Sequence, residues 1–143
     1  MQTYEDDIVA WANEQARLLR EGQFDRLDIV HIAEEIEDVG KSEQRELASR
    51  MAVLLAHLLK WKYRSDQRGR SWEGTIRTQR RAIALRLART PSLKAILSDA
   101  AWWEETWADA VAAATLETGL DTFPDNCPWP QADILHPDWL RKL

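Results

Sequence analysis

The apolar residues between positions 4 and 117 recur at intervals of three and four, and this spacing constrains the fold more than any other feature. Because an α-helix turns once in 3.6 residues, such spacing aligns apolar side chains along one face of each helix. No stretch alternates apolar and polar residues as a half-buried strand would. Four of the five prolines fall within residues 123–140, which therefore cannot form one continuous helix. The sequence predicts an all-α protein.

The pattern divides into five helices followed by a C-terminal arm rich in proline and tryptophan. The predicted helices cover residues 4–21, 25–39, 42–61, 71–89 and 91–117. Gly22, Gly40 and Gly119 stand where the first, second and fifth helices are expected to end, because glycine often follows the last helical residue. Ser71 is the expected N-cap of the fourth helix.

The length of 143 residues suits one domain with a core of its own. We expect residues 1–119 to form the bundle and residues 120–143 to pack on it as an arm of the same domain. Cys127 is the single cysteine, which rules out an intrachain disulfide and fits a reducing compartment. The acidic N-terminus lacks a signal peptide's apolar region, and no apolar run reaches the ~18 residues of a membrane span. A cytoplasmic protein is expected.

The net charge of −5 conceals three blocks of opposite sign. Residues 1–59 carry 6 Lys/Arg against 13 Asp/Glu, residues 60–89 carry 10 against 2, and residues 90–143 carry 3 against 9. The central basic block could form an anion-binding face. Alternatively, the acidic helix containing AEEIE (residues 33–37) could neutralise it inside the bundle. The sequence leaves both open, and the second is favoured.

We predict a binding or adaptor module rather than an enzyme, with no cofactor. Arginine forks suit carboxylates and phosphates, and tryptophan can stack on a ligand. The residues expected to form or neutralise the working face are Arg68, Arg70, Ser71, Trp72, Arg77, Arg80, Glu34, Glu35 and Glu37. The predicted partner is an unknown protein or a polyanion. Nucleic acid is not favoured, because the pI near 5.2 is low for that class.

A homo-oligomer is also expected. Trp102 and Trp103 are adjacent and cannot both face the core of one helix. An exposed member of this pair would favour an interface or serve as the anchor of an adaptor protein.

Arg50 and His57 support an alternative enzymatic hypothesis. They satisfy the loose R-x4-6-H pattern of the HEPN superfamily, whose helical members often cleave RNA without metal. The resemblance would imply an endoribonuclease using these two residues. However, Arg26 and His31 match the same pattern, and a boundary network in which Glu46 pairs with Arg50 is the simpler explanation.

A metal site is not predicted. His31, Glu34, Glu35 and Asp38 share the polar side of one helix, a spacing that could ligate a metal. No Glu-x-x-His pair occurs, so a carboxylate-bridged di-iron bundle is not supported. We expect a solvated or arginine-paired acidic face instead, and Cys127 as a packed thiol.

Several segments strongly resemble a bacterial family known as domain-of-unknown-function family twenty-nine. They are AEEIE at 33–37, SR-x-x-V-L-L-x-H-L-L-K-W at 49–61, RSW at 70–72, and the later FPDNCPW. The resemblance covers nearly the whole chain and implies an all-helical fold. It implies no activity, cofactor or catalytic residue.

Overall fold

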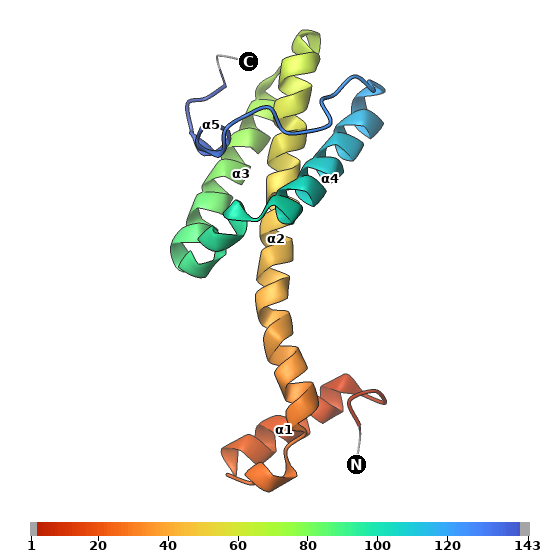
Figure 1. Ribbon diagram of the computed structural model, residues 1–143, viewed down its shortest axis with the longest axis vertical. Coiled ribbons are helices and arrows are strands. Elements are labelled where there is room, and N and C mark those ends of the chain that lie inside the picture. The colour runs from red at the N-terminus through yellow and green to blue at the C-terminus, as the bar shows by residue number, and fades with distance from the viewer. Residues whose placement is uncertain (1–2, 141–143) are drawn as a thin grey trace. The chain divides into compact units, whose positions relative to one another are not determined.

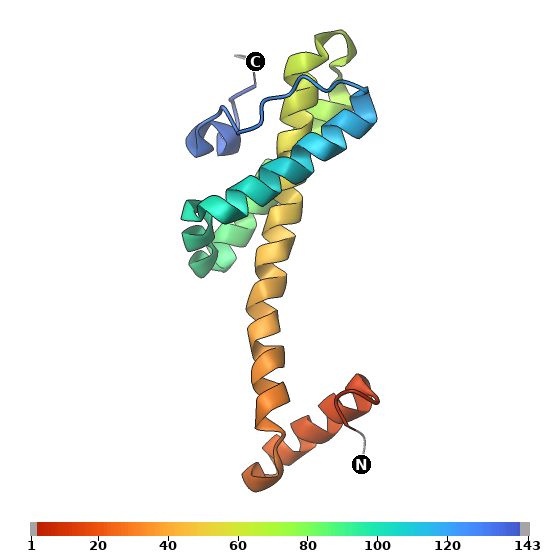
Figure 2. The ribbon, with the colours of Figure 1, turned by 45° about the vertical axis from the view of Figure 1, so that its right-hand side comes forward.

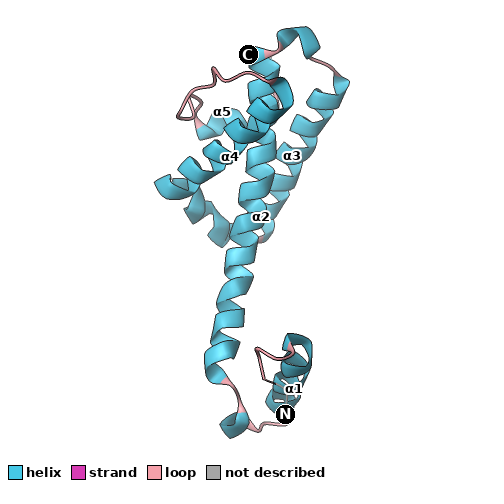
Figure 3. Cartoon of the chain, turned by 90° about the vertical axis from the view of Figure 1, so that its right-hand side faces the viewer, coloured by secondary structure: helices cyan, strands magenta, loops and turns pink. Residues whose placement is uncertain are grey.

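Only helices, turns and loops occur in residues 3–140, which are the residues that the structure, a computed structural model, describes (Figure 3). The α-helices are α1 (Ile8–Arg20), α2 (Ile29–Tyr63), α3 (Arg70–Arg89), α4 (Ala100–Thr118) and α5 (Gln131–Leu135). Short 3-10 helices are η1 (Phe24–Arg26), η2 (Ser65–Gln67) and η3 (Pro91–Ser98). The all-α prediction is confirmed.

The chain divides into two compact units, Met1–Ser42 and Glu43–Leu143. We call them the N-terminal and C-terminal units, and α2 contributes residues to both. The expectation of one domain, with residues 1–119 as the bundle and 120–143 as its arm, stays a prediction.

The N-terminal unit begins with α1, whose ends follow local signals. The Asp7 side chain accepts a hydrogen bond from the Ala10 N–H at 3.1 Å and caps the helix. After the helix, Gly22 adopts a φ of +71°, a conformation that costs glycine little. The predicted stop at Gly22 is therefore confirmed, whereas the helix starts at Ile8 rather than at residue 4.

Side chains of α1 hold the start of α2 within this unit. The Trp11 indole N–H donates to Asp28 at 2.9 Å, and the Gln15 side chain accepts from the Asp28 backbone N–H at 2.8 Å. The Tyr4 ring stacks on His31 with centroids 4.2 Å apart. The contacts that fix α2 in this unit are therefore made to its polar side.

In the C-terminal unit, the later half of α2 is the central helix, with α3 and α4 beside it (Figures 1 and 2). An apolar seam of Leu47, Met51, Leu54 and Leu58, spaced by four, three and four residues, runs along this helix and is fully buried. The side chains that pack around it come from four segments: Ile76, Ile83, Trp107, Ala110, Ala114, Phe123 and Ile134. The unit therefore buries its apolar seam as the 3.6-residue period requires.

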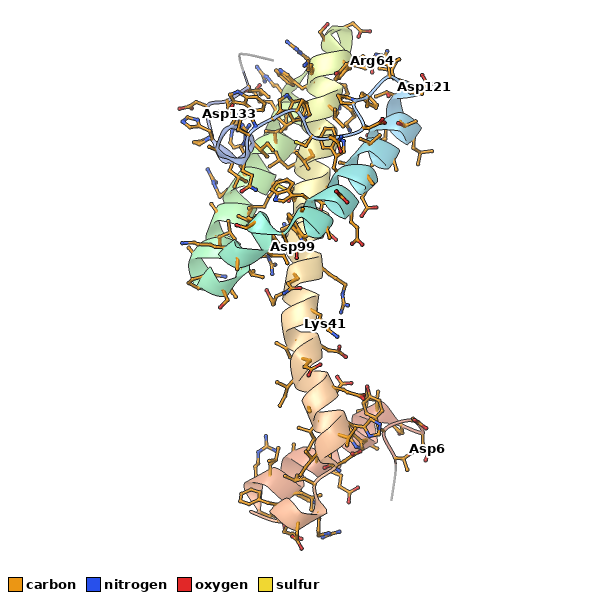
Figure 4. The ribbon with its side chains drawn as sticks, in the orientation of Figure 1. Asp6, Lys41, Arg64, Asp99, Asp121 and Asp133 are labelled. Atoms are coloured by element: carbon orange, nitrogen blue, oxygen red, sulfur yellow. The ribbon has the colours of Figure 1, made fainter. Side chains whose placement is uncertain are left out.

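The segment after α4 packs on this core through backbone and aromatic contacts. The Trp107 indole N–H donates to the Pro124 carbonyl at 2.9 Å, and Phe123 meets Tyr63 edge to face at 5.2 Å. The segment also contains α5, on which Asp133 is labelled in Figure 4. The sequence predicted short turns here and missed this helix.

The predicted helix end at Gly40 is wrong, because α2 runs unbroken from Ile29 to Tyr63. Gly40 does not have a positive φ, unlike Gly22 and Gly119. An interior glycine costs a helix about 1 kcal/mol, which neighbouring turns can offset. No proline lies nearby to remove a backbone hydrogen bond, so the helix continues.

Two other predicted boundaries are wrong. Ser71 is not an N-cap, since α3 starts one residue earlier with Gly69 in that position. The predicted helix over 91–117 is two elements, η3 and α4, which meet at Asp99 (labelled in Figure 4). The Asp99 side chain accepts from the Trp102 N–H at 3.1 Å, so a new helix starts there.

Within residues 3–140, no helix is both long and apolar enough to span a bilayer.

Candidate functional site

The end of α2 and the turn after it bring an arginine onto a tryptophan. The Arg68 guanidinium lies over the Trp61 ring, 5.0 Å from its centroid. Its Nε–H donates to the Trp61 carbonyl at 2.6 Å. Because a guanidinium is planar and weakly hydrated, it packs on an aromatic face without losing its charge.

A cleft of about 670 Å³ opens beside this pair, between α2, α3 and the residues after α5. Its lining residues are Trp61, Arg68, Glu73, Ile76, Arg77, Arg80, Pro137, Asp138 and Leu140. Three of the six arginine, serine and tryptophan residues predicted for the working face therefore lie around one cavity: Arg68, Arg77 and Arg80. We call it the arginine cleft.

Arg80 has a structural task in this cleft. Its side chain is buried and donates to the carbonyls of Ile134 at 2.8 Å and Trp139 at 2.7 Å. Burial lowers the pKa of its guanidinium, and the charge of Asp138 opposes that shift. Arg80 thus joins α3 to the segment containing α5 and adds positive charge to the cleft wall.

Arg77 is an exposed arginine of the cleft, with 67% of its side chain accessible. Its closest acid is Glu73, one turn earlier on α3, with 3.7 Å between Nη2 and the carboxylate. Exposed pairs at this spacing stabilise a helix by only about 0.3–0.5 kcal/mol. Arg77 can therefore exchange Glu73 for another carboxylate at little cost.

Trp61 contributes an unpaired donor. Its indole nitrogen is buried and has no hydrogen-bond partner among the described residues. Buried donors are normally paired. A group with an acceptor oxygen in the cleft would offer this donor a partner. The sequence marked Trp61 only as the last residue of the motif at 49–61, because nothing in its spacing reveals an unpaired indole.

The other predicted residues of the working face lie elsewhere. Arg70 and Ser71 are exposed at the start of α3 and do not line the arginine cleft. Trp72 packs under the Lys60 ammonium group, 5.3 Å from the ring centroid. Lys60 is buried and paired with Glu117, so this tryptophan belongs to a structural contact.

The acidic residues of the AEEIE helix belong to the N-terminal unit, whereas the residues that line the arginine cleft belong to the C-terminal unit. Glu35 accepts a hydrogen bond from the Tyr4 hydroxyl, and that bond raises the Tyr4 pKa to about 12. Glu34 and Glu37 are exposed. Neutralisation of the basic block by these acids stays a prediction.

Within the C-terminal unit, acids of that same unit supply counter-charges to the basic block. Arg86 pairs with Glu43 at 2.7 Å and with Glu46 at 3.5 Å, and Arg64 pairs with Asp66. For these two glutamates, the sequence predicted a pairing of Glu46 with Arg50 and none with α3. Their link to α3 depends on how two helices pack, which helical spacing alone does not give.

Arg50 and His57 do not contact each other. Arg50 forms an ion pair with Glu46 at 3.1 Å, as the simpler explanation predicted. His57 Nδ1 lies 2.8 Å from the Val53 carbonyl, and its Nε2 lies 3.4 Å from the Lys60 ammonium. Burial lowers the His57 pKa, and Lys60 adds to this. No feature of this pair favours the endoribonuclease hypothesis.

The remaining candidates offer no second site. No group of three His, Cys, Asp or Glu side chains within residues 3–140 has the arrangement of a metal site. His31 is paired with Asp28 at 2.7 Å. Burial raises the pKa of the Cys127 thiol, which disfavours the nucleophilic thiolate.

These features define a class: an all-helical protein with a cleft built from arginines on one helix and turn. Residues 3–140 match the family described as Domain of unknown function DUF29, and the chain belongs to this family. The expected resemblance is therefore confirmed. The chain is also similar to a crystal structure of an alpha-helical protein of unknown function from Rhodospirillum rubrum ATCC 11170. The two share 26% identity and a TM-score of 0.60 over 97% of this chain and 92% of the other. A search of curated proteins gave no significant match.

Proposed function

We propose that this protein is a non-enzymatic binding module whose arginine cleft takes an acidic segment of a partner protein. The observation that carries the proposal is the meeting of Arg68, Arg77 and Arg80 around one cavity of about 670 Å³. The lone Cys127 and the bacterial resemblance support the bacterial cytoplasm as its setting.

The chemistry of the lining favours a carboxylate. Arginine binds carboxylates through two parallel hydrogen bonds, which gives both affinity and orientation. Arg77 is exposed and only weakly held by Glu73. The unpaired Trp61 indole N–H adds a donor that a carboxylate or a peptide carbonyl could satisfy.

The acids in the same lining favour a peptide over a nucleic acid. Glu73 and Asp138 lie among the three arginines, so the residues that line the cleft have a net formal charge of +1. A continuous run of phosphates would meet both carboxylates, whereas a peptide can place its own N–H groups against them. The pI of 5.2 also weakens the long-range attraction that nucleic-acid binding uses.

A calorimetric titration with a hexaglutamate peptide tests the proposal, with hexaglutamine as the uncharged probe. We expect hexaglutamate to bind with a Kd of about 1 mM or tighter, which is about −4 kcal/mol. Hexaglutamine should show no binding. Arg77→Ala should weaken hexaglutamate binding about tenfold, because it removes an exposed guanidinium that only Glu73 holds weakly, and Arg77→Lys should recover part of the loss.

Arg70→Ala is the matched control, because Arg70 is an exposed arginine of α3 outside the cleft. The Arg70→Ala variant should bind hexaglutamate with the same affinity as the wild type. Equal losses in Arg70→Ala and Arg77→Ala would contradict a role for the cleft. A single-stranded oligonucleotide that binds more tightly than hexaglutamate would contradict the choice of a protein partner.

A further inference from the structure

The first turns of α2 contact the rest of the N-terminal unit through their polar side. His31 stacks on Tyr4 and pairs with Asp28, and Glu35 accepts from the Tyr4 hydroxyl. At 100° per residue, His31 and Glu35 lie on one side of the helix, while Ile29 and Ile36 lie together on another. The contacts of this unit thus cover the polar side of α2.

The apolar side of the same stretch faces solvent. Ile29 and Ile36 are each 68% exposed, and Val30 and Val39 are each 67% exposed. Ala33 is also exposed, and at 100° per residue it lies with Ile29 and Ile36, while Val30 and Val39 flank these three on opposite sides. We call these five residues the open face of α2. Lys41, labelled in Figure 4, follows it along the helix.

An exposed run of branched apolar side chains is unfavourable in water. Each fully buried Val or Ile side chain gains about 1.5–3 kcal/mol relative to exposure. Single exposed apolar residues are ordinary, but a contiguous group on one helix typically marks an interface. We propose that the open face binds a second copy of this chain. The open face shares no residue with the arginine cleft, whereas the surface on which it docks shares Arg77 with that cleft. The dimer does not depend on the function proposed for the cleft.

Charge complementarity indicates which surface of the second copy binds the open face. Residues 1–42 carry 4 Lys/Arg against 11 Asp/Glu, a balance of −7, so two open faces would repel each other. The complementary surface is the outer side of α3, a helix with 6 arginines and one acid. Electrostatic complementarity of this kind sets which surfaces associate.

The outer side of α3 also has a suitable shape. It holds a shallow groove of about 470 Å³ lined by Gly74, Arg77, Thr78, Arg81, Ala82 and Leu85. Leu85 is 49% exposed, and Arg81 has no ion-pair partner among the described residues. Small side chains beside an exposed leucine can accept isoleucine side chains, while Arg81 faces acids such as Glu37 next to the open face. Two such contacts, exchanged between two copies, would close a symmetric dimer.

Sedimentation velocity on the full chain tests this interface. We expect a dimer in the micromolar range, with dissociation on dilution. Ile36→Asp should raise the dimer Kd at least about tenfold, because it puts a charge into the apolar contact. Leu116→Asp is the matched control, since Leu116 is 88% exposed and lies on α4. It should leave the dimer unchanged, and circular dichroism should show the same helix content in all three proteins.

A charge exchange tests where the open face docks. Arg81→Glu and Glu37→Arg should each weaken the dimer, and the double variant should associate more tightly than either single variant. A double variant no better than the singles would overturn docking on α3. A wild-type chain that stays monomeric at about 1 mM, a concentration that supports even weak complexes, would overturn the interface itself. So would an Ile36→Asp dimer as stable as the wild type.

Discussion

Arg80 was predicted as a binding residue, and it also stabilises the fold. Its position in a basic block suggested a ligand contact, and it does line the arginine cleft. Yet two of its N–H groups bind the carbonyls of Ile134 and Trp139, and only 6% of the residue is exposed. No sequence pattern indicates that a backbone segment 54 residues away will need these donors.

Replacing Arg80 should therefore destabilise the protein. Arg80→Leu leaves two backbone carbonyls without their donors, and an unpaired buried polar group costs about 1–3 kcal/mol. We expect the free energy of unfolding to fall by about 2–4 kcal/mol, measured by urea denaturation. Arg89→Leu, at an exposed position of the same helix, should change it by less than about 0.5 kcal/mol. Similar values for both variants would contradict the structural role.

The histidines give a second prediction at this scale, because the fold shifts the pKa values of two of them in opposite directions. The hydrogen bond to Asp28 raises the pKa of His31 above its usual 6.5, and burial lowers the pKa of His57 below it. In NMR titrations, His31 should titrate above His57. Asp28→Asn should bring the His31 pKa down and leave His57 unchanged.

The two shifted pKa values make the stability contributions of His31 and His57 depend on pH in opposite directions. A raised pKa means that the His31–Asp28 pair stabilises the fold below pH 6.5 and that this contribution is lost as the pH rises through the raised value. His57 is held neutral, so its contribution is present above pH 6.5 and is lost as the pH falls through its lowered pKa. A His57 that titrates above His31 would contradict both assignments.

Among the elements, α2 departs most from the sequence expectation, because two predicted helices form one. The glycine at position 40, like those at 22 and 119, follows a stretch with helical apolar spacing, but only the latter two have a positive φ. Local sequence marks where a helix can stop. Whether it does stop depends on the turns on both sides. Asp99 shows the converse, since it starts a helix inside an apolar pattern that looked continuous.

A matched pair of glycine substitutions tests this account of α2. Gly40→Ala should raise the free energy of unfolding by up to about 1 kcal/mol, because Gly40 is helical and an added Cβ would meet nothing within 4 Å. Gly119→Ala should lower it by about 1 kcal/mol, since its φ is +74°. Thermal or urea unfolding measures both. A destabilising Gly40→Ala would indicate that the helix is interrupted there.

For the whole molecule, the sequence predicted the helical class and much of the C-terminal core, because apolar spacing determines which face of a helix is buried. Leu47, Met51, Leu54 and Leu58 are buried as expected. The cleft could be predicted only in part. Arg68, Arg77 and Arg80 belong to one charged block, whereas Asp138 comes from a segment that no periodic pattern links to α3.

The role of the acidic helix was the least predictable part. Opposite charges in one sequence suggested that they pair, but the described ion pairs of the basic block use Glu43, Glu46, Asp66, Glu73 and Glu117. Charge along a sequence gives sign and amount, whereas pairing requires short distances between side chains. Glu35 accepts from Tyr4, whereas Glu34 and Glu37 are exposed, and the proposed dimer uses Glu37.

The central claim is that the arginine cleft holds an acidic group, and the indole N–H signal of Trp61 tests it most directly. Trp61 lines the cleft and Trp102 does not, although both have a buried indole nitrogen without a partner among the described residues. In two-dimensional NMR, hexaglutamate should shift the Trp61 signal in a saturable way and leave the Trp102 signal in place. A Trp61 signal that does not move, or that moves no more than Trp102, would contradict the claim.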